Sequence, residues 1–409
     1  MRHFSFLKRE ARSLWSDGRG PILLAIAAGW FLSIGTRMIY PILLPQLRTA
    51  YELDLTAAGL LLTVLFVAYG LGQFPGGILS DRFGERLLLI LSTAISVLTL
   101  ILIVTARSTL ILFLVTALFG AGVALYAVAR YTILVDLYPE QVGAANGVTS
   151  AAADAGQSLL PPVAGLIVGV FAWQFGFGFA IPLFVIAAIG LWLVVPSKPP
   201  DPPTHETSML ETAEDVLLGL RGLPVVYGTG TLLLGVSIWQ AVTGFYPTYL
   251  IEVKALSGTL ASVLFGLFFA LGVVIQPVSG AAYDRIGISW SLLFVMGISG
   301  IGLMLLPLLE GFWPLVGVTI LLSTLLGFAP VTQSHLILAL PENIQGTGLG
   351  ILRTVSFTTG AASPVFVGAA ADRGYFDEAF WALAVLAGLT VILGMITPEA
   401  NDDVHHSSN

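Results

Sequence analysis

The chain has 409 residues, of which 56% are hydrophobic and 10% are charged, and its mean hydropathy is +0.92. Soluble domains carry about 25% charged residues, so this composition excludes an ordinary soluble protein and predicts one that has lipid as its solvent. The lack of cysteine excludes disulfides, zinc thiolate sites and thiol catalysis, and the net charge of −7 comes mostly from the ends and loops.

Apolar stretches of about 20 residues, long enough to cross a bilayer core of about 30 Å as helices, follow one another along the chain. Helices are expected because open sheets leave polar edges in lipid. The first stretch, from Pro21, is as long as its successors and lacks a small-residue cleavage site, so we interpret it as a membrane helix rather than a signal peptide. The twelve expected spans are 21–44, 56–79, 87–106, 109–134, 144–170, 175–195, 225–250, 258–281, 288–309, 312–338, 346–371 and 378–397.

The basic residues orient these spans. If the N-terminus lies in the cytoplasm, ten lysines and arginines fall in cytoplasmic segments and four in external ones. Cytoplasmic loops carry the excess of positive charge, so we expect a multi-pass protein of the cell (cytoplasmic) membrane with both termini inside. The remaining three basic residues, Arg37, Arg130 and Arg353, fall within spans 1, 4 and 11.

A segment rich in proline and acidic residues separates spans 6 and 7 and is expected to link two helical bundles. The predicted organisation is a cytoplasmic N-terminal segment 1–20, an N-terminal six-helix bundle 21–195, a cytoplasmic linker 196–224, a C-terminal six-helix bundle 225–397 and a cytoplasmic tail 398–409.

A shift of 203 residues superposes the two halves. It places Gln73, Gly77, Asp81, Arg82 and Gly84 on Gln276, Gly280, Asp284, Arg285 and Gly287. It also places Gly143, Gly147, Pro161 and Gly165 on Gly346, Gly350, Pro364 and Gly368. An aspartate–arginine pair is a rare coincidence in a chain with 10% charged residues, and one offset serves two separate regions. The pattern indicates an internal duplication.

The stretch Gly77-Ile-Leu-Ser-Asp-Arg-Phe-Gly-Glu-Arg86 resembles the loop 2–3 signature of the major facilitator superfamily, and 280–287 is similar to its weaker copy in loop 8–9. The resemblance extends over residues 21–397 in span count, linker position and both loops. It implies an all-α membrane protein with twelve transmembrane helices in two pseudo-symmetric six-helix bundles. A protein of this fold is expected to carry a solute across the membrane by alternating access.

The resemblance implies that the two loops control gating and that their glycines allow helices 2 and 8 to approach their neighbours closely. Glu85 stands where the family pattern usually has a basic residue, so the gating contacts are expected to differ in detail. The alternative is a plain turn whose arginines only orient the chain. The residues assigned to gating are Gly77, Asp81, Arg82, Gly84, Arg86, Gly280, Asp284, Arg285 and Gly287.

The superfamily fold implies that helices 1, 4, 7 and 10 line a central cavity, that 2, 5, 8 and 11 flank it, and that 3, 6, 9 and 12 face lipid. The interiors of the expected lipid-facing spans hold no ionisable residue. The lining and flanking spans hold Arg37, Arg130, Asp154, His335 and Arg353. A charge within the membrane costs at least about 2.5–3.5 kcal/mol on insertion scales, so each is expected to face water, a counter-charge or a ligand.

The three arginines are the first candidates for substrate binding. Arg37 lies about sixteen residues, or ~24 Å, into its span, and we expect it to bind substrate, with helix pairing as the alternative. Arg130 and Arg353 lie nearer the cytoplasmic ends of their helices. For these two the alternative is pairing with Asp136, with Asp81 or with the lipid interface.

Other polar residues in the lining spans complete the predicted site. Trp239, Gln240, Tyr246 and Gln333 are expected to contact a polar organic solute, although any one of them can instead be a packing residue. Asp154 lies mid-membrane, where a lone charged carboxylate is costly, so we expect it to couple transport to protons or to pair with a buried arginine.

Asp136 and His335 are also assigned to coupling. Because His335 is placed almost at the inner end of span 10, an interfacial histidine is the simpler interpretation of that residue.

Arg37 followed by a Pro-x3-Pro pair, and Arg130 followed by Asp136, resemble the anion:cation symporter branch of the superfamily. That branch moves organic carboxylates or phosphate with protons or sodium. Thr36 stands where the branch has an acidic residue, so the match is partial. Guanidinium groups pair bidentately with carboxylate or phosphate, which favours a small anionic substrate with H+ or Na+ as the coupling ion.

A proton-coupled exporter is the main alternative. The pattern Gly-x8-Gly-x4-Pro-x3-Gly over 147–165 resembles the antiporter signature of span 5, with Leu160 and Ala164 in place of two of its glycines. Thr116 stands in place of the span 4 arginine of exporters, and we therefore favour symport.

Two further functions are a membrane sensor or scaffold and an enzyme. A membrane sensor or scaffold on the same fold would use the same helices without moving a solute. An enzyme is not expected, because the glycine-containing stretch 70–75 lies within a span and follows no strand, unlike a nucleotide-binding loop. We expect no cofactor, no metal and no nucleic-acid partner. The expected partners are the small solute, the coupling ion and the lipid bilayer, and the protein is expected to be a monomer.

Overall fold

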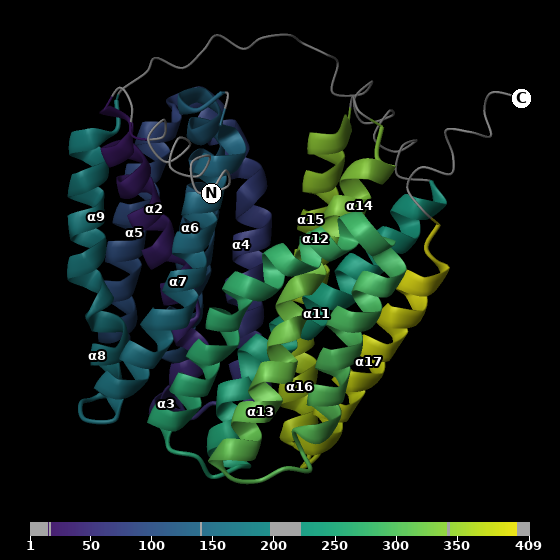
Figure 1. Cartoon of the computed structure of the whole chain (residues 1–409). Helices are drawn as coiled ribbons and strands as arrows, with labels where there is room; N and C mark the ends of the chain where they lie inside the picture. The colour runs from purple at the N-terminus through teal and green to yellow at the C-terminus, as the bar shows by residue number, and fades with distance from the viewer. Residues whose placement is uncertain (1–14, 16–17, 140, 197–221, 342–343, 399–409) are drawn as a thin grey trace, which may run out of the picture. The chain divides into compact units, whose positions relative to one another are not determined.

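The computed structural model describes residues 15, 18–139, 141–196, 222–341 and 344–398, with the backbone alone for Asp81. Most of the predicted N-terminal segment, the linker and the tail lie outside this part. Its regular structure is entirely helical (Figure 1). The first half contains α2 (Gly20–Arg37), α3 (Ile39–Tyr51), α4 (Leu55–Phe83), α5 (Glu85–Thr105), α6 (Thr109–Leu137), α7 (Val142–Val168), α8 (Trp173–Gly178) and α9 (Ala180–Val194). The second half contains α11 (Leu223–Glu252), α12 (Gly258–Leu305), α13 (Phe312–Ser323), the 3-10 turn η2 (Thr324–Gly327), α14 (Phe328–Ala339), α15 (Gln345–Gly360), α16 (Ser363–Ala371) and α17 (Phe376–Ile396).

All twelve expected spans have helical counterparts, although only nine helices of the described chain are both long and apolar enough to cross a membrane. Spans 8 and 9 are joined in α12 through a kink at Gly287. Span 11 is divided into α15 and α16, of 16 and 9 residues. Span 5 is the 27-residue α7, which is rich in small and polar residues. Spans 5 and 11, which the 203-residue shift superposes, are therefore the least apolar.

Span 1 is longer than predicted and is interrupted. α2 ends at Arg37, the amide of Met38 bonds to the carbonyls of Gly35 and Thr36, and α3 then continues to Tyr51. Pro45 lies inside α3, so the helix extends beyond the predicted end at residue 44. The interruption places the Arg37 side chain at the C-terminal end of a helix, where the helix dipole favours positive charge.

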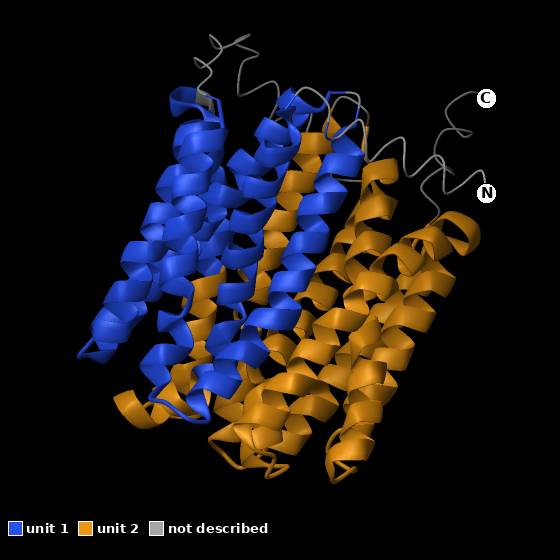
Figure 2. Cartoon of the chain, turned by 60° about the vertical axis from the view of Figure 1, so that its left-hand side comes forward, with its two compact units in different colours: residues 1–43, 67–203 blue, residues 44–66, 204–409 orange. Residues whose placement is uncertain are grey.

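The chain divides into two compact units, residues 1–43 with 67–203 and residues 44–66 with 204–409 (Figure 2). Both α3 and α4 begin in one unit and end in the other. The turn that joins spans 1 and 2 therefore packs with the second half of the chain.

Glycines set the closest helix approach in the first unit. A Cβ atom on Gly156 of α7 would lie 2.2 Å from the carbonyl oxygen of Phe31 in α2. A Cβ atom on Gly35 of α2 would lie 2.6 Å from the carbonyl oxygen of Gly156. Small residues allow helix backbones to approach in this way, and no larger residue fits at this crossing without a backbone shift.

The backbone repeats with the same period as the sequence. Gly84 and Gly287, 203 residues apart, have φ values of +82° and +70° with extended ψ, a conformation essentially confined to glycine. Glu52 and Ala255, also 203 residues apart, are the two non-glycine residues of the described chain with positive φ, at +53° and +54°. Matching unusual conformations at one offset support the internal duplication.

Candidate functional site

Arg37 is buried in the first unit at the end of α2. Its side chain is 5% exposed, and its guanidinium carbon lies 4.5 Å from the centre of the Tyr69 ring of α4. A cation over an aromatic face is stabilised by the ring quadrupole, more so when both are removed from water. The aromatic face and the helix end both lower the cost of placing this charge in the membrane.

Arg130 of α6 is held by three elements of the same unit. Its Nη1 donates to Oδ1 of Asn146 at 2.8 Å and to Oγ1 of Thr149, both at the start of α7. Its guanidinium carbon lies 4.9 Å from the centre of the Trp30 ring of α2. The Trp30 ring stacks on Tyr126, with centroids 5.9 Å apart. The side chain is 9% exposed, so α2, α6 and α7 together fix its position.

The aromatic pair beneath Arg130 is itself anchored. Tyr126 is fully buried, and its hydroxyl donates to the carbonyl of Ile26 at 2.8 Å. A Cβ atom on Gly29 would lie 2.1 Å from that hydroxyl oxygen. Gly29 therefore makes the space in which the tyrosine, and with it the stacked Trp30, is seated.

Asp154 lies half-buried on α7 near the crossing with α2. Its Oδ1 accepts a long hydrogen bond of 3.4 Å from Nε2 of Gln157. Asp154 precedes Gly156 by two residues and Arg37 follows Gly35 by two, so both charged residues flank the glycines of that crossing. Arg130 reaches α7 five to eight residues before Asp154. The first unit thus holds Arg37 against Tyr69 of α4, Arg130 against the start of α7, and Asp154 on α7.

The aromatic and amide candidates of α11 lie in the second unit, where they bridge helices. Trp239 lies between the rings of Phe66 and Phe357, with centroid distances of 6.1 and 6.2 Å. Nε2 of the fully buried Gln240 donates to the carbonyl of Phe357 at 3.0 Å. The hydroxyl of the fully buried Tyr246 lies 2.6 Å from Oγ1 of Thr319. Gln240 and Tyr246 therefore contribute to helix packing in this conformation.

His335 of α14 is fully buried rather than interfacial. Its Nε2 lies 3.2 Å from the carbonyl oxygen of Pro224 at the start of α11, and its ring lies edge-on to Tyr283 of α12 at 6.3 Å. These contacts join three helices. Gln333, two residues earlier, is half-buried.

Arg353 on α15 and Asp136 near the end of α6 are both exposed. They differ in this respect from Arg37 and Arg130, which are buried.

The two signature loops, which are predicted to control gating, adopt defined conformations. Gly84 caps the start of α5, and Gly287 provides the kink in α12. Nη2 of Arg86 donates to the carbonyl of Trp192 in α9 at 2.6 Å, and the Arg82 guanidinium carbon lies 5.5 Å from the centre of the Phe83 ring. Asp284 and Arg285 are exposed. Asp81 has no described side chain.

The expected close approach at Gly77 and Gly280 is not observed in the described chain. A Cβ atom on Gly77 would meet nothing within 4 Å, and one on Gly280 would meet only Pro330 at 3.9 Å. The close contact of α4 is made by Gly72, five residues before Gly77. A Cβ atom added there would lie 2.9 Å from the Cβ atom of Ala124 in α6.

Tyr69, Trp30, Asn146 and Thr149 contact the two arginines and were not predicted from the sequence. Trp30 lies seven residues before Arg37 on the same helix, but the arginine that it contacts is Arg130 of α6, so this spacing does not identify the contact. The other three lie on neighbouring helices, and no local spacing relates them to the arginines.

Comparison with known proteins gives a consistent result. The sequence profile of the Major Facilitator Superfamily matches residues 25–351 and, in an overlapping alignment, 256–407. A hexuronate transporter of Bacillus subtilis is 23% identical over 93% of this chain and 95% of its own length. A 2-nitroimidazole transporter of Escherichia coli is 26% identical over 86% of this chain and 89% of its own length. The solved structure of a D-xylose–proton symporter superposes with a TM-score of 0.75 at 16% identity, covering 93% of this chain and 98% of that one.

The fold prediction is confirmed, since the all-helical chain has the fold of twelve transmembrane helices in two bundles. The chain is a multi-pass membrane transporter of small solutes and not an enzyme. It belongs to the Major Facilitator Superfamily.

Proposed function

We propose that this transporter moves a small organic anion across the cytoplasmic membrane together with H+ or Na+. The observation that carries the proposal is the pair of buried arginines, Arg37 and Arg130, in one unit of the fold. Two positive charges in a membrane interior are costly, and an anionic ligand offsets that cost.

The geometry of the two arginines suits a carboxylate. Each guanidinium lies over an aromatic ring, Tyr69 for Arg37 and Trp30 for Arg130. A guanidinium carries its N–H groups in one plane, and this planar fork donates paired hydrogen bonds to a carboxylate or phosphate. A hexuronate, the solute named for one relative, carries such a carboxylate.

Asp154 is our candidate for ion coupling. It is a half-buried carboxyl beside the glycine crossing of α2 and α7, two residues from Gly156. A carboxyl there can gain a proton or bind a cation as its access to water changes. We prefer it to Asp136, which is exposed, and to His335, which is held by the carbonyl of Pro224.

We further propose that both termini face the cytoplasm, as the ten-to-four distribution of basic residues indicates, and that the protein acts as a monomer. The bundles are assigned to 21–195 and 225–397, joined by the linker 196–224. Arg353, Trp239 and Gln333 are secondary candidates for the substrate site.

Proton-coupled export of an uncharged solute is the second candidate. Gly156, part of the antiporter-like pattern of span 5, lies at the tightest helix crossing of the first unit, and one relative carries the name 2-nitroimidazole transporter. Packing alone requires this glycine, so the observation favours export less than the arginines favour anion symport.

Reconstituted vesicles separate these functions. With labelled glucuronate as the probe and an inward proton or sodium gradient, a symporter accumulates the anion inside. An exporter instead accumulates labelled 2-nitroimidazole against an opposed proton gradient, and a sensor moves neither probe.

The Asp154→Asn variant tests the coupling assignment in the same vesicles. It is expected to keep anion exchange at equal concentrations on both sides but to lose accumulation, because the amide neither gains nor loses a proton. Accumulation equal to that of the unmodified protein would remove Asp154 as the coupling residue.

A further inference from the structure

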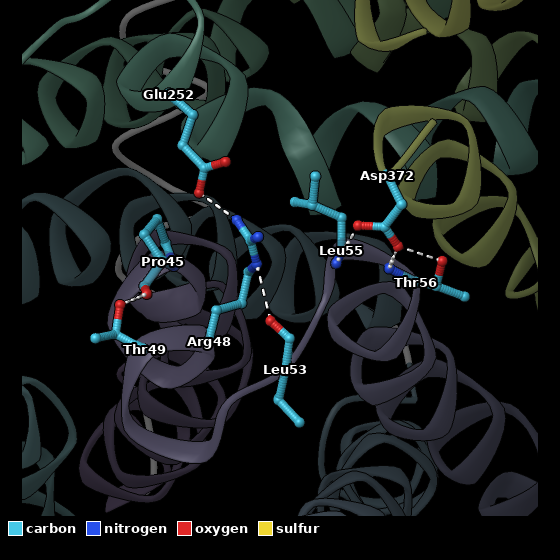
Figure 3. Close-up of polar contacts among 8 residues, drawn as sticks. All are labelled: Pro45, Arg48, Thr49, Leu53, Leu55, Thr56, Glu252 and Asp372. Carbon is cyan, nitrogen blue, oxygen red and sulfur yellow. Dashed lines mark hydrogen bonds and ion pairs between the residues drawn. The ribbon is translucent and has the colours of Figure 1, made fainter. Parts of the chain in front are cut away.

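Residues 44–66, the end of α3 and the start of α4, pack against the second half of the chain through polar contacts (Figure 3). Nη1 of Arg48 in α3 forms an ion pair with Oε1 of Glu252, the last residue of α11. Nε of the same arginine donates to the carbonyl of Leu53 at 3.3 Å. Arg48 therefore stabilises the turn between spans 1 and 2 through the Leu53 carbonyl and also joins this turn to α11 through Glu252.

Asp372, which follows α16, caps the N-terminus of α4 (Figure 3). Its Oδ1 accepts from the amide of Leu55 at 2.8 Å. Its Oδ2 accepts from the amide of Thr56 at 2.7 Å and from the Thr56 hydroxyl at 2.5 Å. Hydrogen bonds to an ionised acceptor are about twice as strong as neutral ones, and the positive end of the helix dipole adds to them. One carboxylate thus satisfies two otherwise open amides of a helix 316 residues away.

The backbones are in contact just below this cap. A Cβ atom on Gly368 of α16 would lie 2.1 Å from the carbonyl oxygen of Leu55, and one on Gly59 of α4 would lie 2.4 Å from that of Pro364. The glycines bring the two helix ends close enough for Asp372 to reach the first turn of α4.

These contacts are absent from the other half of the repeat. The residue 203 positions before Asp372 is Gly169, and the residue 203 positions before Glu252 is Thr49. The start of α12, which corresponds to the start of α4, is capped within its own turn by Ser257, whose Oγ accepts from an amide at 3.3 Å. In the described chain both helix starts have a local cap, from Asp54 and Ser257, and only α4 has the additional cap from the distant Asp372.

We propose that Arg48, Glu252 and Asp372 form a latch that keeps one side of the transporter closed. Because α3 and α4 continue into the first unit, any movement that carries their joined ends with that unit must break these contacts. The latch closes the outer side if the termini are cytoplasmic, and this naming of the side rests on the proposed orientation.

Asp372 is expected to contribute most to the latch. The Arg48 and Glu252 side chains are 21% and 33% exposed, and ion pairs open to water are weak and screened by salt. Asp372 is itself exposed, but it makes three short hydrogen bonds, two of them to backbone amides at the positive end of a helix.

The test measures opening directly, without a substrate. The chain has no cysteine, so spin labels at Arg107→Cys and Glu310→Cys report only the distance between those two sites. Both sites are exposed and are related by the 203-residue shift. In reconstituted vesicles, Asp372→Asn is expected to raise the ratio of long-distance to short-distance populations about five- to thirty-fold, as a loss of one or two kcal/mol does.

Asp54→Ala is the matched control. Oδ1 of Asp54 accepts from the amide of Ala57 at 2.7 Å, so this residue caps the same helix terminus from within its own helix. The control is expected to loosen α4 without a comparable rise in the open population. An equal rise in both variants, or no rise in Asp372→Asn, would overturn the latch.

A cross-link provides a second test if Asp372→Asn folds poorly. For this test the spin labels at positions 107 and 310 are attached by oxime bonds to p-acetylphenylalanine, so that Arg48→Cys and Glu252→Cys supply the only two thiols. Joining these by a short, reducible bis-thiosulfonate reagent is expected to remove the long-distance population, and reductant is expected to restore it. A population that still opens while cross-linked would contradict the proposal. Since neither test uses a transported solute, both remain valid if the anion assignment fails.

Discussion

Arg37 and Arg130 are buried inside predicted membrane spans, and their contacts explain how their charges are tolerated. Each guanidinium lies within 5 Å of the centre of an aromatic ring. Arg37 also ends a helix, and Arg130 donates to Asn146 and Thr149. These contacts stabilise the positive charge in the absence of a ligand, which is what the proposed release of an anion requires.

The first prediction concerns Arg37. In Arg37→Lys the charge is kept, but the planar fork and its fit to the Tyr69 ring are lost. Transport of labelled glucuronate is expected to fall at least about tenfold, since one hydrogen bond to a charged group contributes about 1.5–3 kcal/mol. Arg107→Lys, at an exposed loop position, is the control and should transport normally. Full activity of Arg37→Lys would make that residue a packing element.

The second prediction is the pH dependence of the latch. Burial of Asp372 opposes its ionisation, but hydrogen bonds from the Thr56 hydroxyl and from the amides of Leu55 and Thr56, with the nearby Arg48 charge, outweigh it and lower the pKa of the carboxyl. A carboxyl with a lowered pKa stabilises the latched state above its ordinary pKa of about 3.9, and that stabilisation is lost as the pH falls through the lowered value. Spin-label distances are expected to show no latch opening between pH 5 and 8. Opening within that range that Asp372→Asn abolishes would contradict this assignment.

At the scale of elements, helix packing in the first unit depends on particular glycines. The third prediction compares two glycines of the same helix, α7. A Cβ atom on Gly156 would lie 2.2 Å from the Phe31 carbonyl oxygen, whereas one on Gly147 meets nothing within 4 Å. Gly156→Ala is expected to destabilise the protein by about 1–3 kcal/mol through overpacking. Gly147→Ala is expected to be neutral or stabilising, because alanine favours a helix by up to about 1 kcal/mol.

Thermal unfolding in detergent, followed by tryptophan fluorescence, measures both glycine variants. Equal melting temperatures for the two would mean that the α2–α7 crossing adjusts without cost.

The elements themselves were largely predictable. Apolar length identified all twelve helices, and one offset identified a repeat whose unusual φ values recur at Glu52 and Ala255. Apolar length did not predict the interruption at Met38, because a run of apolar residues carries no signal for a local change of backbone angle.

The residues that contact the candidate site and the latch from other helices could not be predicted from the sequence. Tyr69 reaches Arg37 from another helix, and Asp372 reaches Thr56 across 316 residues. Periodicity tells which face of a helix is apolar, but in a membrane both protein and lipid satisfy such a face. It therefore does not tell which helices pair.

At the scale of the molecule, α4 connects the proposed latch to the signature loop that is predicted to control gating. Its N-terminus holds the latch through Thr56, and its C-terminal end holds Asp81 and Arg82 of the signature loop. About 25 residues, or ~38 Å along the helix axis, separate Thr56 from Asp81. α4 is a single helix over this length, with Pro75 inside it. We propose that it lets a contact at one end oppose a contact at the other, as alternating access requires.

The last prediction follows from that opposition. Asp372→Asn weakens the latch and should favour opening at the outer side, whereas Asp81→Asn weakens the proposed cytoplasmic gate and should favour opening at the inner side. Free-energy changes at well-separated sites add to within about 0.3–0.5 kcal/mol, so the double variant is expected to return toward the populations of the unmodified protein. Spin-label distances between Arg107→Cys and Glu310→Cys measure the open population in the unmodified protein, the two single variants and the double variant. If the double variant opened the outer side further than Asp372→Asn alone, Asp81 would not be a gate opposed to the latch, and α4 would not connect the two.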